Sequence, residues 1–129
     1  MRFFSNANDA KDFFIAKIVE QARLEHVPLS DVETRMLHWT EVHPIPGMDR
    51  DALQRLSEEF DQQCNSDEYE SKIVGLLQRA YERDSSDEQK TSDYRSAYEV
   101  LSREDHYLLV MIDASITGKL RKNRFLGIF

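Results

Sequence analysis

The chain has 129 residues, of which 32% are charged, and it carries a formal net charge of −7. This length is typical of one domain and is sufficient to bury a hydrophobic core. The excess of acids argues against a nucleic-acid-binding protein, because phosphate recognition requires a concentrated basic surface.

Three features predict a soluble, cytoplasmic protein. Cys64 is the single cysteine, so one chain can form neither an intramolecular disulfide nor a cysteine-based zinc site. The strongest apolar stretch, residues 107–112 (YLLVMI), is far shorter than the roughly 20 residues that cross a bilayer. The N-terminal sequence also lacks the uninterrupted apolar run of a secretion signal.

The first two helices are predicted from apolar spacing and from a cap. Apolar residues at helical spacing predict a helix over residues 8–26, which ends before Pro28. Ser30 and Glu33 have the capping-box pattern, in which each side chain accepts a hydrogen bond from the other residue's backbone amide, and they predict a second helix to about residue 41. The residues expected in the core from these helices are Phe14, Ile15, Ile18, Val19, Ala22, Val32, Met36, Leu37 and Trp39.

The middle of the chain predicts two further helices. Residues 43–47 (HPIPG) are expected to form a loop, because two prolines and a glycine interrupt any regular pattern. A third helix is expected over residues 49–64 and a fourth over residues 67–83. Their predicted core residues are Leu53, Leu56, Phe60 and Cys64 in the third helix, and Tyr69, Ile73, Leu76, Leu77 and Ala80 in the fourth.

Residues 84–92 (DSSDEQKTS) contain no apolar side chain and predict an exposed linker. Two alternatives remain for the sequence beyond it. A fifth helix can end near Leu101 and a sixth can end at Gly118. Alternatively, one continuous helix covers residues 93–117. Its apolar positions that stay in phase are Leu101, Leu108, Ile112 and Ile116.

These patterns together predict the all-α fold class. No alternating strand pattern occurs between turn signals, and no internal repeat is present. We expect an irregular bundle of five or six helices joined by short loops, with residues 1–118 as a single helical domain.

His38, Glu41 and His43 form one candidate site. Histidines beside a carboxylate are typical of metal centres and of acid-base chemistry. The two histidines are five residues apart, whereas metal ligands on one helical face are three or four apart. We therefore expect ordinary polar groups at a helix end, with a metal site as the alternative. No cofactor is predicted.

Acidic residues and one cysteine supply further candidates. Residues 49–70 contain eight acids and two arginines, which is typical either of a docking face for a basic partner or of solvated helix faces. Cys64 is expected to pack as a small apolar side chain, since neighbouring acids disfavour a reactive thiolate. Asp113 interrupts an apolar run and is expected to face solvent.

The C-terminal tail, residues 119–129 (KLRKNRFLGIF), differs from the rest of the chain. Its four cations are accompanied by no acid, so the −7 of the whole chain corresponds to −11 for residues 1–118. The candidate partner- or membrane-binding residues of the tail are Lys119, Arg121, Lys122, Arg124, Phe125 and Phe129.

Three interpretations of the C-terminal tail are open. It can fold back, pairing its cations with the acidic helices and burying its aromatic rings, which we expect because proteins seldom expose large apolar patches. It can instead contact an anionic membrane surface, where cations and aromatic groups bind together. It can also mark the cytoplasmic side of a membrane span.

No arrangement of residues predicts a named reaction, because no nucleophile is accompanied by a base and an oxyanion donor. The leading prediction is a protein-protein interaction or regulatory module that binds another protein, including a second copy of itself. A membrane-proximal protein that uses the C-terminal tail is one alternative. A small metal-dependent enzyme centred on His38, Glu41 and His43 is another.

Overall fold

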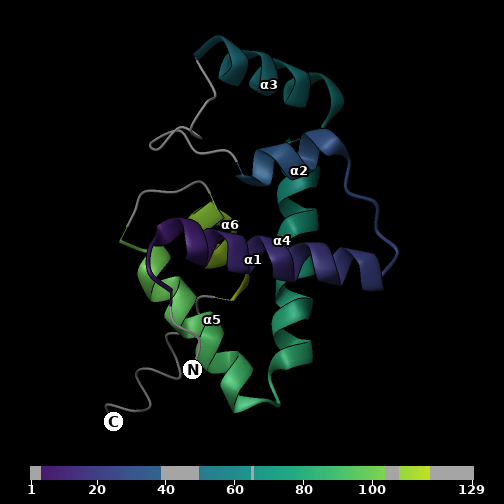
Figure 1. Cartoon of the computed structure of the whole chain (residues 1–129). Coiled ribbons are helices and arrows are strands. Elements are labelled where there is room, and N and C mark those ends of the chain that lie inside the picture. The colour runs from purple at the N-terminus through teal and green to yellow at the C-terminus, as the bar shows by residue number, and fades with distance from the viewer. Residues whose placement is uncertain (1–3, 39–49, 65, 104–107, 117–129) are drawn as a thin grey trace.

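The structure is a computed structural model that describes residues 4–38, 50–64, 66–103 and 108–116 (Figure 1). Of Arg50, Leu53 and Ser66 it describes the backbone only. Every regular element in the described residues is an α-helix, which confirms the predicted all-α bundle. The six helices are α1 (Ala7–Leu24), α2 (Asp31–His38), α3 (Arg50–Gln63), α4 (Ser66–Asp84), α5 (Glu88–Leu101) and α6 (Leu108–Ser115).

The helices α1 and α4 cross near the centre of the molecule, and the other helices pack around them (Figure 1). α1 packs against α4 and α5, while α6 packs against α4. α2 lies beside α1, and α3 packs mainly against α2 at one end of the molecule. Phe60 also links α3 to α4, because its ring meets the ring of Tyr69 edge-on with 5.1 Å between centroids.

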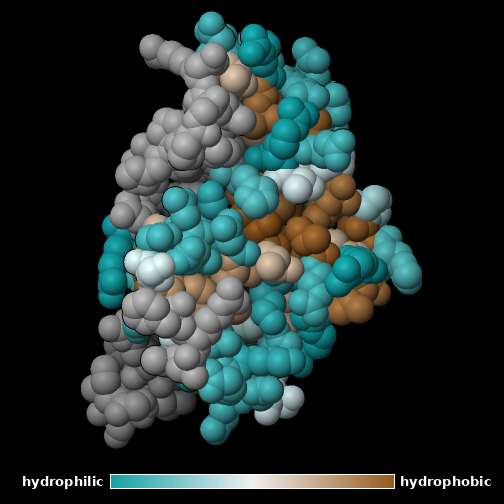
Figure 2. All heavy atoms as spheres, viewed as in Figure 1, coloured by the Kyte–Doolittle hydropathy of each residue, from teal (hydrophilic) through white to brown (hydrophobic). Residues whose placement is uncertain are grey.

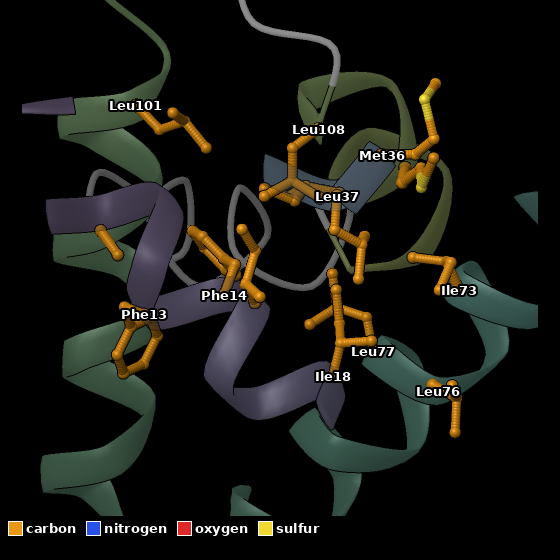
Figure 3. Close-up of a cluster of buried hydrophobic side chains, with 14 of the residues drawn as sticks. Phe13, Phe14, Ile18, Met36, Leu37, Ile73, Leu76, Leu77, Leu101 and Leu108 are labelled. Atoms are coloured by element: carbon orange, nitrogen blue, oxygen red, sulfur yellow. The ribbon is translucent and has the colours of Figure 1, made fainter. Parts of the chain in front are cut away.

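Apolar side chains from α1, α2, α4, α5 and α6 meet in one core, part of which is drawn in Figure 3. Phe14, Ile18 and Leu77 lie within it and have no exposed surface. Most of the predicted core residues that the structure describes are buried, as helical periodicity requires. Val19 is an exception, with 40% of its surface exposed.

The predicted capping box at the start of α2 is confirmed. The Glu33 amide donates to the Ser30 hydroxyl oxygen, and the Ser30 amide donates to the Glu33 carboxylate, both at 3.1 Å. These two hydrogen bonds satisfy amides that the first turn of a helix leaves without intrahelical partners.

α1 ends in a left-handed residue, His26, whose φ is 57°. The Val27 amide donates to the Ala22 carbonyl at 2.8 Å, and the His26 amide donates to the Arg23 carbonyl at 3.2 Å. This pair of hydrogen bonds is the Schellman motif, which satisfies the last carbonyls of a helix. The chain changes direction at His26, so Val27 lies beside α4 and does not continue the axis of α1.

The prediction of an exposed linker over residues 84–92 was wrong at both ends. Asp84 is only 3% exposed, and α5 begins at Glu88. The Asp87 carboxylate accepts from the amides of Gln89 and Lys90, so it caps α5 several residues earlier than the apolar pattern indicates. The first turn of α5 is polar because it faces solvent, and the pattern therefore did not reveal it.

The alternative with separate fifth and sixth helices is the observed one, since α5 ends at Leu101 and α6 begins at Leu108. Asp113 is exposed, as expected, and accepts a hydrogen bond from the Tyr98 hydroxyl at 2.9 Å. Among the described helices, none is both long enough and apolar enough to cross a membrane.

Candidate functional site

The candidate metal site lies only partly within the described residues, because Glu41 and His43 fall outside them. The Nδ1 atom of His38 lies 4.0 Å from a carboxylate oxygen of Asp12. Burial and the nearby Lys11 ammonium lower the pKa of His38, so the imidazole is favoured in its neutral form. In the described part of the chain, His, Cys, Asp and Glu side chains form no group of three suited to a metal ion.

The six candidate residues of the C-terminal tail also lie outside the described residues. Those residues are Lys119, Arg121, Lys122, Arg124, Phe125 and Phe129. Their role in binding a partner or a membrane therefore stays a prediction.

The structure shows a site that the sequence did not predict, which we call the α4 furrow. Two adjoining hollows of about 570 and 240 Å³ share Glu68 and Lys72 as lining residues, and together they follow α4 from Asp67 to Arg79. The furrow is lined by Val27, Glu33, Gln63, Cys64, Asp67, Glu68, Tyr69, Ser71, Lys72, Leu76 and Arg79. These residues come from α2, α3, α4, the connection between α1 and α2, and the residue that follows α3.

One end of the α4 furrow is apolar and depends on a glycine. Val27 is partly exposed there, Leu76 borders this end but has no exposed surface, and Leu24, three residues before Val27, is 56% exposed. Arg79 closes the end by donating from Nε to a Glu25 carboxylate oxygen at 2.7 Å. A Cβ atom on Gly75 would lie 2.8 Å from Nη1 of Arg79, so the absent side chain leaves room for this guanidinium.

Figure 2 shows that apolar residues also reach the surface near the C-terminal half of α1. Val19 and Leu24 are the large apolar residues of α1 that are exposed there, at 40% and 56%. Hydrophilic residues border this area on the face drawn in Figure 2. Apolar groups ringed by polar ones are typical of surfaces that bind other molecules.

An ion pair fixes the middle of the α4 furrow. The Lys72 ammonium lies 2.7 Å from a Glu33 carboxylate oxygen, and the Tyr69 hydroxyl donates to the Glu33 carbonyl at 3.4 Å. Burial disfavours the ionised form of Glu33, but the hydrogen bonds from Lys72 and from the Ser30 amide outweigh it and lower the pKa of this carboxyl. Glu33 therefore stays ionised at neutral pH and holds α2 against α4.

The other end of the α4 furrow is polar and contains the cysteine. Residues 58–70 include six acids and no cation, and two of these acids are exposed and line the furrow: Asp67 lines the hollow of Val27, and Glu68 lines both hollows. Cys64 is partly exposed, and burial together with the Glu33 charge raises the pKa of its thiol. The thiol is thus protonated at neutral pH, which does not favour nucleophilic catalysis.

A buried carboxylate forms a second polar cluster, which the sequence placed wrongly in a linker. Asp84 lies within 4 Å of Lys17, Arg83 and Lys90, at 3.0, 3.5 and 3.7 Å, and it accepts from the Tyr94 hydroxyl at 2.9 Å. Burial opposes ionisation, but Lys17 and Tyr94 outweigh it and lower the pKa of Asp84. The cluster joins α1, α4 and α5, so we assign it to the stability of the fold.

One signal in the sequence could have indicated the buried position of Asp84. It follows Ala80 by four residues and Tyr81 by three, so it continues the buried stripe of α4. Its burial became favourable only through Lys17 and Tyr94, which belong to other helices.

Two features of this molecule thus remain as candidates for function, the α4 furrow and the apolar surface beside it. No family model matches the chain, and no curated protein or solved structure does so either. What the furrow can bind therefore follows from its own shape and charge.

Proposed function

We propose that the protein is a helical interaction module and that the α4 furrow binds a segment of a partner protein that is both basic and apolar. The observation that carries this proposal is that apolar and acidic residues lie next to each other along the furrow. Val27, which is partly exposed, lies at its apolar end, and the exposed carboxylates of Asp67 and Glu68 line the same hollow. A segment with an apolar side chain and a neighbouring lysine or arginine complements both parts.

Ion pairs between the helices that border the furrow favour binding without a large rearrangement. The Lys72–Glu33 pair joins α4 to α2, and the Arg79–Glu25 pair joins α4 to the end of α1. The Lys72–Glu33 pair is the less exposed of the two, and it fixes two lining residues before any partner arrives. A site that is already ordered loses little entropy on binding.

The charge of the chain supports a basic partner. Residues 1–118 carry −11, and the exposed acids Asp67 and Glu68 line the furrow. A negative surface attracts a basic segment over a distance of about 8 Å at physiological ionic strength and speeds association. We therefore expect binding that weakens as salt is added.

The size of the furrow supports a weak and reversible complex. Hollows of about 570 and 240 Å³ accommodate a few side chains rather than a folded domain. Interfaces of this kind bury little area, and we expect a dissociation constant of about 1 to 100 μM. The free thiol of Cys64 in this surface supports a reducing compartment such as the cytoplasm.

Selection from a display library of random peptides tests this proposal. We expect the wild-type protein to enrich peptides that combine apolar residues with lysine or arginine. The double substitution Asp67→Lys and Glu68→Lys should remove this enrichment, because it reverses the charge of the furrow at two exposed positions in the first turn of α4.

Asp51→Lys with Glu88→Lys is the matched control. These acids are exposed, lie in the first turns of α3 and α5, and are outside the furrow, so the control makes the same charge change at equivalent helix positions. It should retain the enrichment. The proposal is wrong if no peptide is enriched, if enriched peptides are acidic, or if both double variants behave alike.

A further inference from the structure

The exposed side of α1 carries four side chains in a symmetric order. Asp12, Ala16, Val19 and Arg23 are all exposed, and they follow one another at intervals of four, three and four residues. Eleven residues are close to three helical turns, so Asp12 and Arg23 lie on the same side of α1, about 16 Å apart along its axis. We call these four residues the α1 face. It has an acid at one end, a cation at the other, and two apolar residues between them.

We propose that two copies of this chain associate through the α1 face, with their α1 helices antiparallel about a two-fold axis. The spacing of the face is the same from either end, but the charges at the two ends have opposite signs. In an antiparallel pair, Arg23 of each copy therefore lies opposite Asp12 of the other, and Ala16 and Val19 lie at the centre. None of these residues lines the α4 furrow, so the inference does not depend on the proposed function.

The two charged residues of the α1 face are available for contacts between copies. The side chain of Asp12 is 64% exposed, and its carboxylate lies 4.0 Å from Nδ1 of His38. Burial lowers the pKa of His38, so the neutral imidazole does not balance the charge of Asp12. Within the described residues, the guanidinium of Arg23 has no ion pair. Both charges can therefore gain a partner when two copies meet.

The centre of the α1 face supplies an apolar contact. Val19 is 40% exposed, and Ala16 is exposed and small. Small side chains at a contact allow two helices to approach to about 8 Å between their axes. Close to the two-fold axis, Val19 of one copy then packs beside Val19 of the other, and both lose contact with water. In Figure 1, α1 crosses in front of α4 and none of the described helices lies in front of α1, so a second helix has access.

The charges of the α1 face select the antiparallel orientation. In a parallel pair, Asp12 would face Asp12 and Arg23 would face Arg23, and like charges across an interface weaken binding. The antiparallel pair is closed after two copies, because both use the same surface. One helix from each copy buries less than about 1,200 Å² in total, which is typical of weak association. We therefore expect a dissociation constant of about 0.1 mM.

Exchange of the two charges tests both the surface and the orientation. Asp12→Arg alone places cations opposite each other at both ends of the pair, and Arg23→Asp alone places acids there. Each variant should therefore dimerise at least about tenfold more weakly than the wild type. An equimolar mixture of the two variants should regain about the wild-type affinity, because every facing pair again has opposite charges. The double variant should form a homodimer for the same reason.

Sedimentation equilibrium at physiological ionic strength, between about 10 μM and 1 mM protein, measures these affinities. Asp51→Arg and Arg55→Asp are the matched controls. Both residues are exposed on α3 and four residues apart, and the two substitutions change the net charge as those of the α1 face do. The controls should dimerise like the wild type. They separate contacts of the α1 face from general repulsion between two chains of net charge −7.

Methyl resonances locate the contact independently of the affinities. Those of Val19 should shift as the wild-type protein is concentrated. Those of Val110, which is 58% exposed on α6, should stay constant. In Asp12→Arg, the resonances of Val19 should no longer change over the same range of concentrations, while circular dichroism shows the same helical content as in the wild type.

Three results would overturn the inference. The first is a chain that stays monomeric at about 1 mM with constant Val19 resonances, at ten times the expected dissociation constant. That result would leave the α1 face to a partner of another kind. The second is a dimer that neither Asp12→Arg nor Arg23→Asp weakens, which would place the contact elsewhere. The third is a loss of affinity in both single variants that mixing does not restore, which would exclude the antiparallel pair. None of these results concerns the α4 furrow.

Discussion

The Lys17 ammonium lies 3.0 Å from the Asp84 carboxylate, although 67 residues separate them in the chain. Lys17 also lies over the rings of Phe13 and Tyr94, at 5.7 and 5.6 Å from their centroids. The Tyr94 hydroxyl donates to the same carboxylate. One buried acid therefore holds the end of α4 against both α1 and α5.

Asp84→Asn should lower the free energy of unfolding by about 3 kcal/mol, because it removes the buried negative partner of Lys17 and leaves that cation uncompensated. Urea denaturation followed by circular dichroism measures the change. Glu59→Gln is the control, since the Arg35–Glu59 pair is exposed and should contribute less than about 1 kcal/mol. Equal effects of the two substitutions would contradict the structural role of Asp84.

Acid should destabilise the protein through the same carboxylates. The pKa values of Asp84 and Glu33 are both lowered below their ordinary values of 3.8 and 4.5. Each therefore stabilises the fold fully above its ordinary pKa and loses that contribution as the pH falls through its lower folded value. The free energy of unfolding, measured between about pH 6 and pH 2, should fall less steeply for Asp84→Asn with Glu33→Gln than for the wild type. An equal pH dependence of the free energy of unfolding in the two proteins would show that protonation of these carboxylates is not coupled to unfolding.

His26→Gly should stabilise the protein by about 1 kcal/mol. The φ of 57° at His26 costs energy for any residue with a Cβ atom, whereas glycine adopts it freely. His26→Ala removes the imidazole but keeps the Cβ atom, so it should not reproduce the gain. Thermal unfolding of the three proteins checks this, and a lower melting temperature for His26→Gly would contradict the Schellman end of α1.

Gly75→Ala should raise the free energy of unfolding by about 0.5 kcal/mol. Alanine gains about 1 kcal/mol within a helix, but its Cβ atom displaces the flexible Arg79 side chain and weakens an exposed ion pair with Glu25. In an Arg79→Ala background the same substitution should give the full gain of about 1 kcal/mol. Urea denaturation of the four proteins in this cycle tests the coupling, and a zero coupling energy would show that Gly75 does not make room for Arg79.

Local patterns predicted much of the fold. The capping box of Ser30 and Glu33 lies within four consecutive residues, and the buried stripe of α4 follows from helical periodicity alone. Both depend on neighbours in sequence. Val19 and the start of α5 were predicted wrongly, because the first depends on which faces of α1 find partners and the second on a polar cap.

The α4 furrow could not be predicted in this way. Its shape depends on Lys72 meeting Glu33 across 39 residues and on Arg79 meeting Glu25 across 54. Neither pairing leaves a periodic signal in the sequence. The acids of residues 49–70 are typical either of a docking face for a basic partner or of solvated helix faces, and only the folded chain brings Asp67 and Glu68 beside Val27 and Leu76.

A peptide titration tests most directly whether the α4 furrow is a binding surface. A peptide enriched in the selection from the display library is added to the isotopically labelled chain. We predict that the methyl resonances of Val27 and Leu76 shift with saturation, that those of Leu101 and Leu108 do not, and that Asp67→Lys with Glu68→Lys abolishes the shifts. Resonances of Val27 and Leu76 that stay unchanged up to millimolar peptide would contradict the account.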